Sequence, residues 1–144
     1  MSESQRFPVA VHALVYLAHK DARAPEQAVS SGLLASSMPT NPVVVRRVTA
    51  MLGRAGLVGA RSGAGGGAWL TRDPATITLD QVLRAVNGCA HLGLPPPGAK
   101  GCPVGEKIPK VVSAAIKAAD EAAAERLSRI TVADLLAQIE PAAA

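Results

Sequence analysis

The chain has 144 residues, of which 49% are hydrophobic and 2% aromatic, and a formal net charge of +4. All of the excess charge lies in residues 1–75, which hold eight Lys or Arg and four Asp or Glu, a balance suited to a polyanionic partner. Two cysteines exclude a secreted disulfide framework, and no segment reaches the roughly 20 apolar residues of a membrane span. We therefore expect a cytoplasmic protein without a membrane partner.

Two helices are expected before residue 40. Apolar residues recur at spacings of three and four over residues 7–18, which predicts a helix with one buried face. A short second helix is expected at about 31–37. Pro39 then disfavours helix in the residue before it, so a turn follows.

A third helix is predicted over about residues 41–55. Asn41 is a favoured N-cap residue, and Pro42 suits the first helical position. Three arginines share the face opposite the apolar one: Arg46, Arg47 and Arg54. A short helix, a tight turn and a longer helix with a basic outer face is the helix-turn-helix pattern, whose second helix enters the DNA major groove.

A β-hairpin is predicted directly after this helix. Leu57-Val58 and Trp69-Leu70 have the pattern of short strands on either side of a glycine-rich link at 63–67, with Arg61 on the first arm. In this place a hairpin would be a wing. The glycines also match a dinucleotide-binding fingerprint, but the β-α-β unit that such a site needs is not predicted around them.

The C-terminal half is predicted to be helical around one long loop. Thr78 and Gln81 form a capping box that opens a helix. The loop at 88–106 contains three consecutive prolines and both cysteines, and its length suggests function. A long helix from about 108 to 129 carries an apolar seam, which favours pairing with a second copy, although packing on the chain's own core is the alternative. The expected dimer residues are Val112, Ile116, Ala119, Ala123 and Leu127.

The predicted fold class is mainly α: a winged helix-turn-helix of three helices and a two-stranded wing, with a long C-terminal dimerisation helix. We expect the DNA-binding domain at residues 1–76. A linking helix and the loop with its cysteines follow at 77–107. Residues 108–144 would hold the dimerisation helix and a last short helix.

Cys89 and Cys102 lie at either side of the proline loop and are candidate sensor residues. Their uses would be a redox switch, a ligand shared across a dimer or an effector contact, and the alternative is an unreactive thiol. Two cysteines are too few for a cluster held by four thiolates of one chain. We therefore expect no metal site and no cofactor, with an iron–sulfur cluster left open as the alternative.

Four segments in this order resemble the Rrf2 family of bacterial winged-helix regulators: FPVAVHALVYLA, NPVVVRRVTAMLGRAGLV, GARSGAGGGAWL and ITLDQVLRAV. The resemblance covers about residues 6–140 and implies a dimer that binds an inverted-repeat operator and usually represses transcription. It implies DNA-binding residues on the third helix and in the wing. These are Thr40, Asn41, Arg46, Arg47, Arg61, Ser62, Gly65 and Gly66. Family members with iron–sulfur clusters carry three closely spaced cysteines in the loop, so this chain resembles the branch without that motif.

The sequence thus predicts a homodimeric DNA-binding repressor without catalytic activity, with double-stranded DNA and a second copy as partners. One alternative is a winged-helix module that binds proteins and no DNA. Another is a thiol-based redox protein that uses Cys89 and Cys102, although the chain has no C-x-x-C motif.

Overall fold

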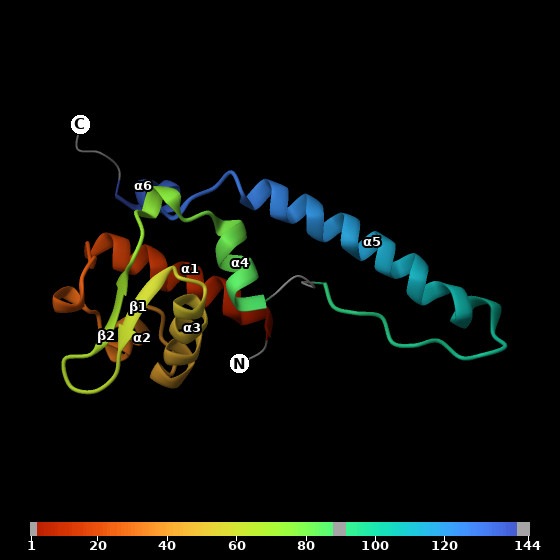
Figure 1. Ribbon diagram of the computed structural model, residues 1–144, viewed down its shortest axis with the longest axis horizontal. Coiled ribbons are helices and arrows are strands. Elements are labelled where there is room, and N and C mark those ends of the chain that lie inside the picture. The colour runs from red at the N-terminus through yellow and green to blue at the C-terminus, as the bar shows by residue number, and fades with distance from the viewer. Residues whose placement is uncertain (1–2, 88–91, 141–144) are drawn as a thin grey trace.

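A helical body and a long projecting helix make up the computed structural model, which describes residues 3–87 and 92–140 (Figure 1). Within these residues there are six α-helices and one two-stranded antiparallel sheet. The elements of the body are α1 (Glu3–His19), α2 (Ser31–Ser37), α3 (Pro42–Arg54), β1 (Val58–Arg61), β2 (Gly67–Leu70), α4 (Leu79–Asn87) and α6 (Val132–Ile139), with short 3-10 helices at Pro25–Gln27 and Pro74–Thr76. The projecting helix is α5 (Pro103–Leu127).

The core of the body forms where α1 packs against α3, α4 and α6. Leu14 and Leu17 of α1 are fully buried there, as are Val48 and Leu52 of α3. Each pair is spaced three or four residues apart and so lies on one helical face, as the periodicity predicts. Packing against α1 therefore fixes which face of α3 is buried and which remains exposed.

The two helices of the helix-turn-helix begin at polar caps. The Ser30 hydroxyl accepts a hydrogen bond from the Leu33 N–H at 3.1 Å and starts α2. The Asn41 carboxamide oxygen accepts one from the Val43 N–H at 2.8 Å, and Pro42 occupies the first position of α3. These contacts satisfy N–H groups that have no partner within a helix, which is why both predicted starts are confirmed to within a residue.

The wing is joined to the chain segment that precedes α2. β1 and β2 pair from Val58 with Leu70 to Arg61 with Gly67, so both strands are longer than the sequence predicts. Ala68 of β2 also bridges Val29 through two backbone hydrogen bonds of 2.9 Å. At Gly67, a Cβ atom would lie 2.2 Å from the Val29 carbonyl oxygen, so this close approach requires glycine. The predicted winged helix-turn-helix fold is confirmed.

α5 begins at Pro103, several residues before the predicted start at about 108. Cys102 is the N-cap and Pro103 takes the first position, so Pro109 lies inside the helix. Both prolines suit a first helical turn, so this local preference does not distinguish the two starts, and the predicted start is too late. The predicted boundary between 107 and 108 consequently falls within α5. The capping box of Thr78 and Gln81 is confirmed.

α5 extends away from the body, and no residue along its length is buried (Figure 1). The C-terminal end of α5 is the end nearest the body, and there α5 packs on α4. A backbone hydrogen bond of 2.9 Å from the Leu79 N–H to the Ile130 carbonyl holds the chain that follows α5 against the body. In the part of the chain that the structure describes, α5 and the other helices are not long and apolar enough to cross a membrane.

Candidate nucleic-acid interface

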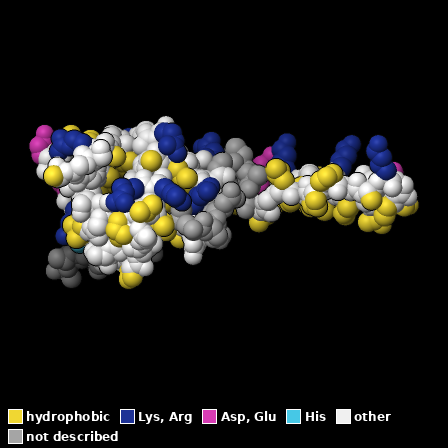
Figure 2. Space-filling model, turned by 90° about the horizontal axis from the view of Figure 1, so that it is seen from below, with side chains coloured by type: hydrophobic (Ala, Val, Ile, Leu, Met, Phe, Trp, Pro, Cys, Tyr) yellow, Lys and Arg dark blue, Asp and Glu magenta, His cyan; other side chains and the backbone are white. Residues whose placement is uncertain are grey.

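The outer face of α3 is basic and exposed. Its members are Val43, Arg46, Arg47, Ala50 and Arg54, all exposed, whereas Val45, Val48, Thr49 and Leu52 point into the body. Among the described residues, no carboxylate forms a salt bridge with any of these three arginines. On the side of the body where α3 and the wing lie, Lys and Arg side chains are spread over the surface and acidic side chains lie at its margins (Figure 2). The positive charge of α3 is therefore available to an anion.

Arg46 is held in place by a residue of α2. Its guanidinium donates a hydrogen bond from Nη1 to the Ser31 Oγ at 3.2 Å. Arg47, the next residue, has no such contact among the described residues and is exposed on the outer face. The two arginines therefore differ: Arg46 points toward α2, and Arg47 is free to extend outward.

The wing places a third cation beside Arg46. Arg61 lies at the end of β1, and its Nη2 donates to the Gly65 carbonyl at 3.5 Å. A cleft of about 480 Å³ opens between α2, α3 and the wing, and both Arg46 and Arg61 line it. Two cations that are 15 residues apart in sequence thus flank one groove. The groove has hydroxyl groups along its walls, supplied by Ser30, Ser31, Thr49 and Ser62.

The predicted DNA-binding residues fall into two groups. Arg46, Arg61, Ser62 and Gly66 line the cleft, and Arg47 lies on the adjacent face of α3. The remaining three have other positions. Thr40 is half-buried in the turn, the Asn41 side chain caps α3, and Gly65 at the wing tip has a φ of +74° and lines a neighbouring hollow with Lys20.

Sequence reasoning missed three hydroxyl residues of the cleft, Ser30, Ser31 and Thr49, and assigned no role to the exposed Val43. Ser31 is half-buried at the start of α2, and Thr49 is buried on the side of α3 that faces α2. The sequence indicates the serine pair at 30 and 31 only as a helix cap. Ser31 follows the cap residue Ser30 in the first helix of the helix-turn-helix. This position is the feature that would have indicated its second role, as the hydrogen-bond acceptor for Arg46.

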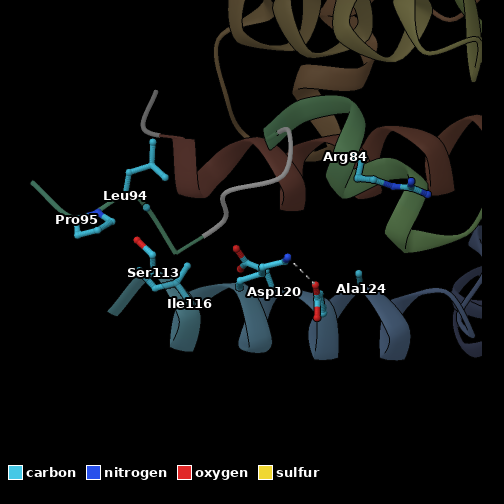
Figure 3. A pocket seen from close by; sticks show the side chains of 10 residues that line it. Arg84, Leu94, Pro95, Ser113, Ile116, Asp120 and Ala124 are labelled. Carbon is cyan, nitrogen blue, oxygen red and sulfur yellow. Dashed lines mark ion pairs between the residues drawn. The ribbon is translucent and has the colours of Figure 1, made fainter. Parts of the chain in front are cut away.

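A second cavity, of about 370 Å³, lies between α4, residues 93–95 and α5 (Figure 3). Leu94, Pro95 and Ile116 supply apolar walls. Two ion pairs lie at its edge: Arg84 with Asp80 at 2.8 Å, and Lys117 with Glu121 at 4.0 Å. Arg84, Lys117 and Glu121 are thus paired, whereas Asp120 also lines the cavity and forms no ion pair with another described residue. The interior of this cavity is mostly apolar.

The predicted dimer residues share one face of α5 but differ in burial. Val112, Ile116 and Leu127 are half-buried, and Ile116 lines the second cavity with loop residues Leu94 and Pro95, whereas Ala119 and Ala123 are exposed. The most exposed large apolar residues of α5 are Val104, Ile108 and Val111. With the exposed Ala115, Ala118, Ala119 and Ala122 they form one stripe along the helix, which we call the α5 stripe. It borders the predicted seam.

The fold and the basic face together define a winged helix-turn-helix of the DNA-binding class. The model of the Rrf2 family, described as an iron-dependent transcriptional regulator, matches residues 3–138. The chain belongs to the Rrf2 family of transcriptional regulators, and the resemblance seen in the sequence is confirmed. It is a DNA-binding transcriptional regulator, a class of proteins that are not enzymes.

Known proteins of similar length support this assignment. The chain is 33% identical over 135 residues to YwnA of Bacillus subtilis, which is classed as an HTH-type transcriptional regulator, and the match covers 92% of this chain and 96% of YwnA. A crystal structure of a transcriptional regulator from Lactobacillus plantarum has a TM-score of 0.73 and 26% identity, covering 95% of this chain and 91% of that one. Another, described as a DNA-binding protein, has a TM-score of 0.67 and 33% identity, covering 91% and 98%.

The donor set of this chain does not fit the iron that the family description implies. An iron–sulfur cluster takes mainly cysteine thiolates, and the chain has two cysteines. Cys102 is exposed, and its Sγ accepts the Gly105 N–H at 3.3 Å, while Cys89 lies outside the described residues. Within 3–87 and 92–140, no three His, Cys, Asp or Glu residues are grouped closely enough to hold a metal ion.

Proposed function

We propose that this Rrf2 regulator binds double-stranded DNA as a homodimer and represses transcription from an inverted-repeat operator. In each protomer α3 would enter the major groove, and the wing would contact the phosphates beside it. The observation that carries the proposal is the pair of cations, Arg46 and Arg61, that flank the cleft between α3 and the wing. Arginine forks match both phosphate oxygens and the guanine edge, and phosphate contacts supply most of non-specific DNA affinity.

The two sides of this interface would have different tasks. Arg61, Ser62 and the backbone of Gly66 lie on the wing, where contacts reach the sugar–phosphate backbone. Arg46 is held toward α2, so it is placed for a phosphate at the groove edge. Arg47 projects from the outer face of α3 and is placed for a base edge.

The α5 stripe supports the homodimer. Val104 is 68% exposed and Val111 is 61% exposed, so an isolated chain would leave a long apolar surface in water. Figure 2 shows hydrophobic side chains in a row along this helix, with Lys and Arg on another side. We propose an interface made of the α5 stripe, which contains the predicted Ala119, and the adjacent predicted residues Val112, Ile116, Ala123 and Leu127. A two-fold axis through paired α5 helices would relate two copies of α3, which an inverted repeat requires.

The test uses a duplex selected by the wild-type protein from a random library. Arg46→Ala and Arg61→Ala should each weaken binding to this duplex in gel-shift titrations at least tenfold. Arg126→Ala, an exposed arginine of α5 outside the cleft, is the matched control and should bind as the wild type does. Circular dichroism and sedimentation should give the same fold and assembly for all three variants. Unchanged affinity in both cleft variants would remove the proposal.

The protein-interaction alternative makes a different prediction for the wild type. A winged helix that binds only proteins would leave random duplex DNA unbound at low salt, where non-specific binding is strongest. Sedimentation of the protein with random duplex therefore separates the two functions. A DNA-binding regulator acts where the chromosome is, so we place the protein in the cytoplasm.

We also propose that the loop before α5 responds to oxidation through Cys102. The thiol is exposed, and it is the N-cap of α5, the helix that carries the α5 stripe. Oxidation of this sulfur would change the start of that helix and so the dimer. Peroxide should lower the affinity of the wild type for the selected duplex and leave Cys102→Ser unaffected. Equal affinities before and after peroxide would rule out this thiol sensor.

A further inference from the structure

Val43 is the one large apolar side chain on the outer face of α3. It is the second residue of the helix and is 43% exposed, whereas Val45 and Val48 are fully buried. It takes no part in the hydrophobic core cluster or in the partly buried side chains packed against it. Arg47 follows one turn later on the same face, so the two side chains lie next to each other.

The position of Val43 distinguishes it from other exposed apolar residues. Single exposed apolar side chains are common, so exposure alone indicates nothing. Residues in the first turns of a recognition helix, however, are those that contact base edges. The Val43 N–H donates to the Asn41 side chain at 2.8 Å, which fixes the backbone of this turn. Valine is also β-branched and keeps one main rotamer in a helix, so little conformational entropy would be lost on contact.

We propose that Val43 contacts the C5-methyl group of a thymine in each half-site and makes that thymine a requirement for tight binding. This inference rests on the proposed function. The thymine methyl is the apolar group that base pairs present in the major groove, and apolar side chains are its usual contacts. Arg46 is drawn toward Ser31 and leaves this part of the face to Val43 and Arg47.

The spacing of the two residues predicts where a second base lies. Four residues of helix advance about 6 Å, and base pairs are stacked about 3.4 Å apart. Arg47 would therefore reach a guanine edge within about two base pairs of the thymine. A selected operator should contain T and G at that separation in each half-site.

Replacing thymine by deoxyuridine tests the methyl contact, because deoxyuridine lacks only the methyl group. Each thymine of the selected duplex is replaced in turn, symmetrically in both half-sites, and affinity is measured by fluorescence anisotropy. One replacement should weaken wild-type binding by about fourfold for each methyl group that it removes from the interface. Val43→Ala should bind the thymine and deoxyuridine duplexes equally. Val43→Thr keeps a methyl group at the same position and should still distinguish them.

The thymine preference of two control variants and the folding of Val43→Ala are measured in parallel. Arg47→Ala and Ile139→Ala, the latter an exposed apolar residue of α6, should retain the preference for thymine. Val43→Ala should fold as the wild type does, because Val43 lies outside the core and alanine favours helix. The inference is overturned if no deoxyuridine weakens wild-type binding, or if Val43→Ala keeps the full thymine preference. Specific binding without thymine dependence would overturn this inference alone, whereas no DNA binding at all would overturn the proposed function with it.

Discussion

The Arg46 guanidinium donates a hydrogen bond to the Ser31 Oγ at 3.2 Å and so links the two helices of the helix-turn-helix. Arg46 is on α3 and Ser31 is the first residue of α2. A side chain held before binding loses less conformational freedom when it meets its ligand. Ser31 is in this sense a positioning residue for Arg46, at the wall of the cleft that α3 and the wing form.

Removing this hydrogen bond should weaken DNA binding without changing the fold. A typical hydrogen bond contributes about 0.5–1.5 kcal/mol, and this guanidinium–hydroxyl bond is exposed to water, so we expect Ser31→Ala to lower affinity for the selected duplex by about two- to tenfold. Adding Ser31→Ala to Arg46→Ala should have no further effect, since the two residues act through one contact. Ser36→Ala in the same helix is the control. Additive effects in the double variant would contradict the positioning role.

Gly67 and Gly53 should respond in opposite ways to alanine. Gly67 has a φ of +149°, and a Cβ atom there would meet the Val29 carbonyl at 2.2 Å, so Gly67→Ala should lower the free energy of unfolding by about 1–3 kcal/mol. Gly53 lies inside α3, where a Cβ atom has its nearest neighbour at 3.8 Å. Gly53→Ala should therefore raise the free energy of unfolding by about 0.5–1 kcal/mol. Urea unfolding measures both, and stabilisation by Gly67→Ala would contradict the packing at the base of the wing.

Asn41 is among the predicted DNA-binding residues, but its side chain caps α3. Asn41→Ala should lower the free energy of unfolding by about 1 kcal/mol, whereas Asn41→Ser keeps a capping oxygen and should be close to the wild type. Thermal unfolding followed by circular dichroism distinguishes the two. Equal stability of both variants would show that the cap contributes nothing.

A charge on the α5 stripe should dissociate the proposed dimer. Val111→Asp places a carboxylate in the proposed interface, where burying it without a partner is costly. Lys110→Asp puts the same group on the neighbouring residue, outside the stripe, and is the control. Sedimentation equilibrium should show monomers for Val111→Asp and dimers for Lys110→Asp. A dimeric Val111→Asp would place the interface elsewhere.

Local sequence patterns are sufficient to predict much of this fold. Asn41-Pro42 and the pair Thr78 and Gln81 specify helix starts through contacts within four residues, so a single sequence contains the whole of that information. Helical spacing likewise identifies the arginines of α3. The short strands on either side of the glycine-rich link also predict the wing and place Arg61 on its first arm, and the family resemblance agrees with this assignment.

Three features depend on contacts between distant parts of the chain. The Arg46–Ser31 hydrogen bond needs the angle between α2 and α3, which no spacing rule supplies. Pro103 and Pro109 both fit a first helical turn. The helix begins at Pro103, and its first turn lies against the preceding loop, since a Cβ atom on Gly98 would meet the Gly105 carbonyl. Apolar spacing alone predicts the α5 seam, but half of an apolar helix can face its own chain, as Ile116 does.

The most direct test of the account is the salt dependence of binding to the selected duplex. If Arg46 and Arg61 neutralise phosphates, the logarithm of the wild-type binding constant falls linearly with the logarithm of salt concentration. Each phosphate contact contributes about 0.9 to the slope, so Arg46→Ala or Arg61→Ala, which removes one contact from each protomer of a dimer, should reduce it by about two. The Arg126→Ala control should leave the slope unchanged. Identical slopes for the wild type and both cleft variants would contradict the claim that the cleft between α3 and the wing binds DNA.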